Sequence, residues 1–157
     1  SKRPLKAVGP ARLSMEDFFR ASCDIAKVND DSLPQIVDGQ SFVPLLVNKS
    51  EEAINRPLFW HYPNEWGPEG PGIGSYSAVR EGDWKLIYFH TDQSLELYNL
   101  KDDIQENNNL VESNAEKTKE LVTVLTAHLQ AVNAQMPADK ITGEIVPWPK
   151  TILNAKK

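Results

Sequence analysis

Few side chains of this 157-residue chain have the type and spacing to do chemistry. The three histidines, His61, His90 and His128, are too far apart to form a short metal-ligand motif such as H-x-x-x-H. The single cysteine, Cys23, excludes an internal disulfide and a zinc site built from several cysteines. The glycine-rich stretch 67–74 lacks the Lys-Ser/Thr pair of a phosphate-binding loop. The sequence therefore predicts no catalytic residue and no metal ligand.

Each of these side chains has an ordinary structural interpretation. Cys23 lies in an amphipathic helical stretch, where a free cysteine is usually a small buried apolar residue. His128 borders the apolar stripe of a C-terminal helix, and His90 falls at a predicted hairpin tip, where we expect it to be solvated. His61 differs because it ends an aromatic strand and leads into the glycine-rich loop. It could line a binding site or bond a neighbouring carbonyl, and the sequence leaves both open.

The aromatic residues around this loop are compatible with a sugar-binding site. Phe59 and Trp60 precede His61 in the strand and are expected to pack in the core. A strand end followed by a long loop is a common place for binding groups. The residues predicted to bind a substrate are His61, Asn64 and Trp66.

Composition and charge exclude some classes of partner. The chain has 17 basic and 22 acidic residues, a net charge of −5, and 40% of its residues are hydrophobic. Binding to nucleic acid or to an anionic membrane surface requires clustered Lys and Arg, so neither partner is expected. No apolar run approaches the roughly 20 residues of a membrane-spanning helix. The composition is ordinary for a globular domain.

The first third of the chain contains one clear helix signal. Residues 1–13 form a basic stretch interrupted by proline and glycine. Ser14 and Asp17 then approximate a capping box, and apolar residues at helical spacing continue to about Lys27. Residues 30–56 contain prolines and an Asp-Gly pair, which predict an irregular connector.

The middle of the chain has the alternation of β-strands. We expect a long loop over residues 64–74 and a hairpin turn at Glu81-Gly82, where glycine supplies a positive φ. The predicted strands are residues 58–62, 75–80, 83–89 and 95–100. Because they are joined by hairpins, they should form a largely antiparallel sheet.

A long helix follows the strands. Ser113 and Glu116 form a capping box, and Pro137 should end the helical region. An apolar stripe that must cover the sheet contains Leu121, Val122, Leu125, Leu129 and Val132. The tail to Lys157 is expected to be extended. The predicted fold class is α+β: a four-stranded sheet packed against a long C-terminal helix, preceded by one helix and a connector.

Several segments, in order, match the motifs of one family. D-G-Q-S-F-V-P-L-L at 38–46 and R-P-L-F-W-H-Y-P at 56–63 are two of them. V-R-E-G-D-W-K-L-I at 79–87 and E-L-Y-N-L at 96–100 are two more, with Glu106 and Asn109-Leu110 following. Together they resemble the C-terminal part of type I sulfatases, the formylglycine-dependent enzymes of the alkaline-phosphatase superfamily. The resemblance covers about residues 14–137.

The resemblance implies that this chain is part of a longer enzyme. The family's nucleophile motif is C-x-P-x-R or S-x-P-x-R, whereas Cys23 reads C-D-I-A-K and does not match it. Formylglycine and the calcium ligands would belong to an N-terminal catalytic domain. Residues 1–55 would then be the end of that domain and a connecting strap, and residues 56–157 the C-terminal subdomain. This chain alone is not expected to hydrolyse sulfate esters, and the parent would be periplasmic or secreted.

The implied partners are the parent's own catalytic domain and a sulfated carbohydrate at the rim of the substrate pocket. An apolar patch that a missing domain would cover predicts self-association of this chain, or disorder in residues 1–50. The patch contains Phe18, Phe19, Ile25, Phe42 and Leu45. Two alternatives stay open. One is the same subdomain in a phosphodiesterase-like member of the superfamily. The other is an independent carbohydrate-binding module that uses Trp60, Trp66 and Trp84.

Overall fold

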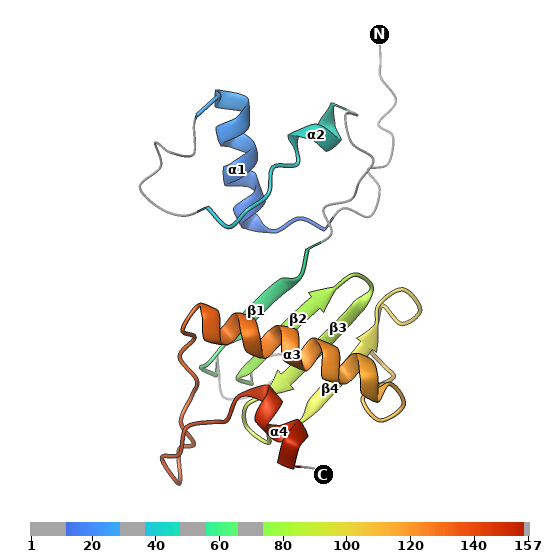
Figure 1. Ribbon diagram of the computed structural model, residues 1–157, viewed down its shortest axis with the longest axis vertical. Helices are drawn as coiled ribbons and strands as arrows, with labels where there is room; N and C mark the ends of the chain where they lie inside the picture. The colour runs from blue at the N-terminus through green and yellow to red at the C-terminus, as the bar shows by residue number, and fades with distance from the viewer. Residues whose placement is uncertain (1–11, 29–36, 48–55, 66–73, 156–157) are drawn as a thin grey trace. The chain divides into compact units, whose positions relative to one another are not determined.

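The computed structural model describes residues 12–28, 37–47, 56–65 and 74–155 (Figure 1). Internal contacts divide the chain into two units, Ser1–Arg56 and Pro57–Lys157, and each is described here by itself. Most of the basic stretch 1–13, much of the connector 30–56 and most of the glycine-rich loop lie outside the described residues. Within the described ranges, no helix is long and apolar enough to cross a membrane.

The first unit contains helix α1 (Met15–Ala26) and the short helix α2 (Val43–Leu46). The predicted N-terminus of α1 is confirmed: the Ser14 backbone N–H donates to Asp17 Oδ2 at 2.7 Å. Lys27 closes the helix in the left-handed conformation, with φ of 57°. This unit leaves large apolar side chains in contact with solvent.

The predicted apolar patch of the first unit is found in part. Phe18, Phe19 and Ile25 are exposed, with 54%, 47% and 68% of their surface accessible. Phe42 and Leu45 are half-buried, and the Phe42 ring meets Phe18 edge-on with centroids 5.1 Å apart. The α1–α2 contact therefore covers only part of the patch.

The second unit is a four-stranded antiparallel sheet with order β1-β2-β3-β4, which confirms the predicted fold class. Its strands are β1 (Leu58–Tyr62), β2 (Tyr76–Glu81), β3 (Trp84–Phe89) and β4 (Leu95–Asn99). The strand bounds differ from the predicted ones by at most one residue. Gly82, with φ of 57°, stands in the tight turn between β2 and β3, as its sequence context predicts.

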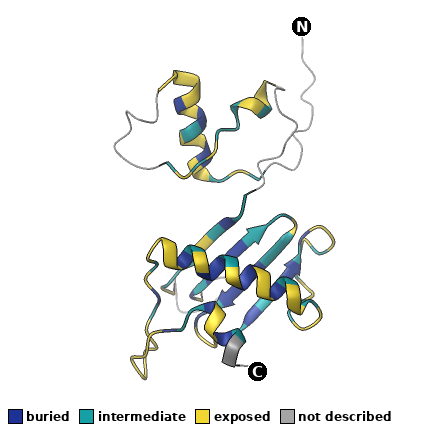
Figure 2. Cartoon of the chain, viewed as in Figure 1, coloured by how far each residue is buried: buried dark blue, intermediate teal, exposed yellow. Residues whose placement is uncertain are grey.

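Helix α3 (Ala115–Ala131) covers one face of this sheet, and the main core lies between them (Figure 1). Figure 2 shows the buried residues concentrated where α3 crosses the strands. The core residues at this contact are Val79, Leu86, Tyr88 and Leu97 from the sheet and Leu121, Val122, Leu125 and Leu129 from the helix. Each fully buried aliphatic side chain contributes about 1.5–3 kcal/mol, so this contact dominates the stability of the unit.

Three details at the ends of α3 differ from the predictions. The N-cap is Asn114 rather than Ser113, and no side chain caps the helix there. Val132 is 57% exposed because the helix ends at Ala131 and the stripe ends with it. The tail is not extended: residues Pro149–Ala155 form helix α4, which packs against α3.

The tail completes the core of the second unit. Val146 and Ile152 are buried in the cluster under α3, and the Tyr88 hydroxyl donates to the Pro147 carbonyl at 3.0 Å. Ala138 and Ile145 form an isolated bridge, which closes the intervening turn. Proline is favourable at the first position of a helix because its missing N–H is not needed there, and Pro149 occupies that position in α4.

Candidate functional site

His61 ends β1 and is held by bonds on both sides of its ring. Its Nδ1 lies 2.8 Å from Ser77 Oγ, and its Nε2 lies 3.1 Å from the carbonyl oxygen of Gln135. Ser77 lies opposite His61 on β2, whereas Gln135 follows the end of α3. The imidazole therefore links the end of β1 to its neighbouring strand and to the chain after the helix.

His90 is buried, which corrects the prediction that it is solvated at a hairpin tip. Only 2% of its surface is accessible, and its Nε2 lies 2.9 Å from Ser77 Oγ. The reason is the period of two in a β-strand: Leu86, Tyr88 and His90 share one face, and that face is covered by α3. The alternation therefore continues one residue beyond the end of β3.

Donor and acceptor can be assigned at each of these hydrogen bonds. A carbonyl only accepts, so His61 Nε2 carries a proton toward Gln135. In the neutral ring, Nδ1 then accepts from the Ser77 hydroxyl, and Ser77 Oγ accepts from His90 Nε2–H. His90 Nδ1 is left buried with no hydrogen-bond partner among the described residues.

The buried position of His90 has an electrostatic consequence. Burial disfavours the imidazolium, and the nearby His61 adds to the effect, so the pKa of His90 is lowered to about 4. The Tyr88 ring meets His90 edge-on with centroids 5.5 Å apart. His90 is therefore neutral at pH 7 and donates, rather than accepts, toward Ser77.

The other predicted site residues near the glycine-rich loop have different surroundings. Asn64 is exposed beyond the end of β1, and Trp66 lies outside the described residues. Glu65, next to Asn64, forms an ion pair with Lys140 at 2.7 Å. The structure thus places His61 and Asn64 at the same strand end, with one side chain bonded within the unit and the other open to solvent.

The aromatic residues divide between the two faces of the sheet. Phe59 packs on the core under α3, as predicted, and its ring stacks on His128 with centroids 3.6 Å apart. Trp84 is partly buried against the same core. Trp60, predicted to be a core residue, points to the opposite face and is 38% exposed. Alternation along β1 places Phe59 and Trp60 on opposite sides.

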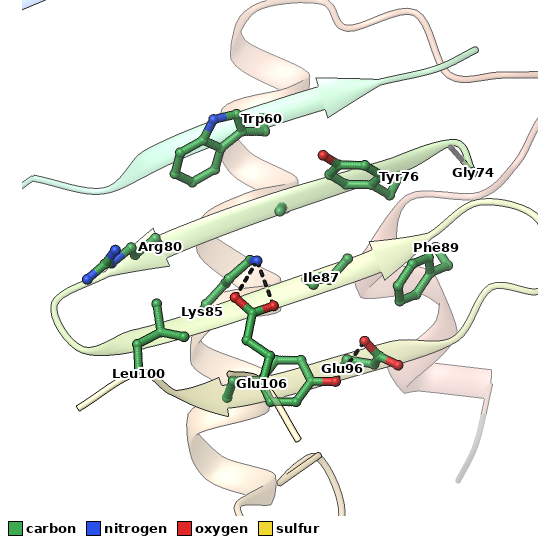
Figure 3. Close-up of a pocket in the computed structure, with 12 residues that line it drawn as sticks. Trp60, Gly74, Tyr76, Arg80, Lys85, Ile87, Phe89, Glu96, Leu100 and Glu106 are labelled. Carbon is green, nitrogen blue, oxygen red and sulfur yellow. Dashed lines mark hydrogen bonds and ion pairs between the residues drawn. The ribbon is translucent and has the colours of Figure 1, made fainter. Parts of the chain in front are cut away.

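That opposite face is hollowed, which the sequence does not predict. The hollow has a volume of about 630 Å³ and is lined by residues of all four strands. Figure 3 shows the side chains that line it. Its lining combines aromatic, aliphatic and charged side chains: Trp60, Tyr76, Ala78, Arg80, Lys85, Ile87, Phe89, Glu96, Tyr98, Leu100 and Glu106, with Gly74 at one end. A volume of this size is within the range of ligand sites and of interface depressions.

Two of the charged side chains in the hollow form an ion pair, and a third is bonded to a tyrosine. Lys85 Nζ lies 2.7 and 2.8 Å from the two carboxylate oxygens of Glu106 (Figure 3). The Tyr98 hydroxyl donates to Glu96 Oε2 at 2.9 Å. Burial, together with this bond to a carboxylate, raises the pKa of Tyr98 to about 12. Tyr98 therefore remains a neutral donor over the whole physiological range.

The turn after β4 explains how Glu106 reaches Lys85. The Asp103 carboxylate accepts from the backbone N–H groups of Asn107 and Asn108, at 3.1 and 2.8 Å. The side chain of Asn109 accepts from the Leu97 N–H at 3.1 Å and so fixes the turn to β4. These bonds fold residues 100–109 back toward the sheet and bring the Glu106 carboxylate over β3.

In the first unit, the Asp-Gly motif binds α1 directly. Asp17 is fully buried and accepts bonds from Ser14 N–H, from Gln40 N–H at 2.7 Å, and from the Arg56 guanidinium. Burial alone would raise the pKa of Asp17, but these hydrogen bonds and the Arg56 charge outweigh it and lower the pKa. Gly39 passes so close to α1 that an added Cβ would lie 2.2 Å from the Glu16 carbonyl oxygen. The motif therefore attaches the connector to the helix.

A model of the family described as N-sulphoglucosamine sulphohydrolase, C-terminal, matches residues 12–135. The chain belongs to this sulfatase family. The match includes both the close approach of Gly39 to α1 in the first unit and the sheet and α3 of the second. The predicted resemblance to the C-terminal part of a sulfatase is thereby confirmed.

Curated relatives of this sulfatase domain are much longer proteins. A sulfatase from Formosa agariphila is 30% identical over 144 residues, covering 85% of this chain and 26% of that protein. An N-acetylglucosamine-6-O-sulfatase from Bacteroides thetaiotaomicron is 28% identical over 131 residues, covering 80% of this chain and 23% of that protein. The chain thus spans about a quarter of the length of these curated relatives.

Solved structures share the fold of the sulfatase domain. A protein in complex with its substrate D-glucosamine-2-N,6-O-disulfate matches with a TM-score of 0.60 and 29% identity, over 74% of this chain and 24% of that one. A 2-O GAG sulfatase matches with the same TM-score of 0.60 at 20% identity, over 76% and 25% of the two chains. The second likeness, at its lower identity, shows the fold alone.

The formylglycine and calcium of type I sulfatases do not fit the described part of this domain. Cys23, which lacks the nucleophile motif, is buried within α1 at 6% exposure. Among the described residues, no group of three or more His, Cys, Asp or Glu side chains is placed to hold a metal ion. No catalytic step is therefore assigned to these residues.

Proposed function

We propose that this chain is the C-terminal part of a sulfatase that removes sulfate from a glucosamine-containing glycan. The observation that carries the proposal is the family match over residues 12–135. Two similar proteins support the substrate class: one is named an N-acetylglucosamine-6-O-sulfatase, and one was solved with D-glucosamine-2-N,6-O-disulfate. The nucleophile and the calcium site would lie in the remaining three quarters of the longer protein.

In this proposal, the end of β1 contributes to the rim of the substrate pocket. Asn64 is exposed there, and an amide side chain offers both a donor and an acceptor to sugar hydroxyls or sulfate oxygens. His61 supports the same strand end through its bonds to Ser77 and Gln135. A rim residue on a strand end that is fixed in this way loses little conformational freedom when substrate binds.

Sulfate release from defined sugars tests the proposal. The full-length protein should release sulfate from glucosamine 6-sulfate or D-glucosamine-2-N,6-O-disulfate, whereas the 157-residue chain alone should not. A phosphodiester such as bis-p-nitrophenyl phosphate is the comparison substrate for the phosphodiesterase alternative. Turnover of the phosphodiester without turnover of any sulfated sugar would refute the proposal, and so would sulfate release by the chain alone.

A substitution of Asn64 tests whether this residue belongs to the rim of the substrate pocket. Asn64→Ala in the full-length protein should lower kcat/KM by about tenfold, the loss of roughly one hydrogen bond, with an unchanged melting temperature. Asn107→Ala, an exposed asparagine in the turn after β4, is the matched control and should leave kcat/KM unchanged. Equal kcat/KM values for Asn64→Ala and Asn107→Ala would show that Asn64 does not contact the substrate.

A further inference from the structure

The chain between α3 and α4 forms a hairpin, residues 138–145, that is ordered without being buried. All of its residues are exposed (Figure 2), and Ile141 in its turn is 95% exposed. Asp139 Oδ1 accepts from the N–H groups of Ile141 and Thr142, at 2.8 and 2.7 Å. The Asp139 N–H donates to the Glu144 carbonyl at 2.8 Å. Since no residue of the hairpin is in the core, its order suits a surface loop that holds binding groups in place.

Two bonds attach this part of the chain to the end of β1. Lys140 Nζ lies 2.7 Å from Glu65 Oε2. The carbonyl of Gln135, shortly before the hairpin, lies 3.1 Å from His61 Nε2. Asn64, the residue proposed for the pocket rim, directly precedes Glu65 and is exposed. The hairpin therefore borders the strand end that carries the rim.

The ion pair between the hairpin and the strand end is suited to exchange with a ligand. The side chains of Lys140 and Glu65 are 79% and 44% exposed, and an exposed pair contributes little to stability. An ammonium group has three donors, so an anionic oxygen can take the place of Glu65. The pair in the hollow differs, because Lys85 is bonded to both oxygens of Glu106 and both side chains are mostly covered.

The hairpin lies beyond the region that the family shares. The family model matches residues 12–135, which include the end of β1 but not residues 138–145. Surface loops vary among homologues more than the elements that they connect, and they often decide what is bound. We propose that Lys140 binds a carboxylate or sulfate group on the sugar next to the glucosamine that loses its sulfate, and that Glu65 pairs with Lys140 when no glycan is bound. This inference rests on the proposed function and names a specificity-determining residue at the same rim.

Two substitutions that break the same ion pair should have opposite effects. The full-length sulfatase is assayed with two disaccharides of 6-O-sulfated glucosamine, one with a uronic acid and one with a neutral hexose as the second sugar. Lys140→Ala should lower the ratio of kcat/KM for the charged over the neutral disaccharide by about fivefold, the usual upper size for an exposed ion pair. Glu65→Gln removes the competing charge and should raise this ratio by about twofold or more. Both effects should diminish in high salt.

A second surface ion pair provides matched controls. Lys117 and Glu120 pair at 2.8 Å in the first half of α3, whereas Gln135 follows the end of that helix. Lys117→Ala and Glu120→Gln change the net charge by the same amounts and should leave the ratio unchanged. A third disaccharide, with a 2-O-sulfate on the uronic acid, distinguishes the two anions. A larger loss in Lys140→Ala on this substrate assigns the contact to sulfate, and an equal loss assigns it to the carboxylate.

Two outcomes in an enzyme that releases sulfate would overturn the inference and leave the proposed function in place. The first is an equal ratio in the wild type, Lys140→Ala and Glu65→Gln. The second is a fall of the ratio in both variants, which would show that the ion pair only holds the hairpin against the strand end. Calorimetric titration of the full-length protein with the same disaccharides gives the ratio of Kd values without turnover. Opposite shifts of this ratio in a protein that releases no sulfate would refute the proposed function and support the binding site, and absence of both binding and sulfate release would refute both.

Discussion

The buried His90 should make the second unit sensitive to mild acid. Its pKa is about 4 in the folded protein, below the ordinary value of about 6.5 that applies in the unfolded chain. As the pH falls below about 6.5, the unfolded chain binds a proton at this position that the folded chain does not bind. Stability is therefore lost between about pH 6.5 and pH 4, and it is fully present above this window.

The two pKa values give the size of the effect. Integrating proton uptake from pH 7 to pH 5 with these values predicts a loss of about 2 kcal/mol in the free energy of unfolding. The carboxylates with lowered pKa, such as Asp17 and Asp92, contribute little in this range because they are ionised in both states above about pH 5. Between pH 7 and pH 5, the change in the free energy of unfolding therefore reports on His90 rather than on these carboxylates.

Urea unfolding followed by tryptophan fluorescence measures this loss. All four tryptophans lie in Pro57–Lys157, so the signal reports on the second unit. His90→Gln keeps an N–H donor but does not titrate. In this variant, the difference between the free energies of unfolding at pH 7 and at pH 5 should be smaller by about 2 kcal/mol. His128→Gln is the matched control and leaves the contribution of His90 in place. An unchanged difference in His90→Gln would show that burial of this imidazole is not what makes the unit acid-sensitive.

Three further substitutions test other parts of the structure. Gly39→Ala should open the first unit to limited proteolysis, because its Cβ would overlap the Glu16 carbonyl; Gly74→Ala, whose Cβ meets open space, should not. Glu106→Gln should lower the free energy of unfolding by about 0.5–1 kcal/mol in urea melts, and less in high salt; salt-independent loss would contradict an electrostatic origin. His61→Ala should cost about 1–2 kcal/mol because both ring nitrogens lose bonds. Unchanged stability with a 10–100-fold lower kcat/KM in the full-length enzyme would instead show substrate contact by His61.

The elements that the sequence predicts well are those whose signal is local. The alternation of residues that face opposite sides and the Glu81-Gly82 turn predict the four strands. The capping box of Ser14 and Asp17 predicts the start of α1. The prediction of an extended tail is wrong because residues 149–155 form α4. Pro149 is the first residue of α4, a position where proline is favourable. The burial of Ile152 against the core then stabilises a helix that is too short to form alone.

The candidate site was less predictable because its side chains meet across the fold. His61 was selected for its place at the end of a strand, but its bond to Gln135, 74 residues away, depends on where the chain goes after α3. The burial of His90 could have been inferred, since it continues the alternation of Leu86 and Tyr88. Its hydrogen bond to Ser77 could not, because that bond depends on the register of β2 against β3.

The same period of two also explains why the hollowed face of the sheet, opposite α3, is not evident in the sequence. Strand segments that are apolar at successive positions, such as Leu86-Ile87-Tyr88-Phe89, fit either a core strand or an aromatic cluster when no partner is known. Once α3 is seen to cover Leu86 and Tyr88, Ile87 and Phe89 must point the other way, toward the hollowed face of the sheet. Ile87 is buried on that side together with Ala78, Tyr98 and Leu100, so the sheet has a second apolar cluster there. Residues 86–89 are therefore apolar in succession because each face of β3 packs into an apolar cluster of its own.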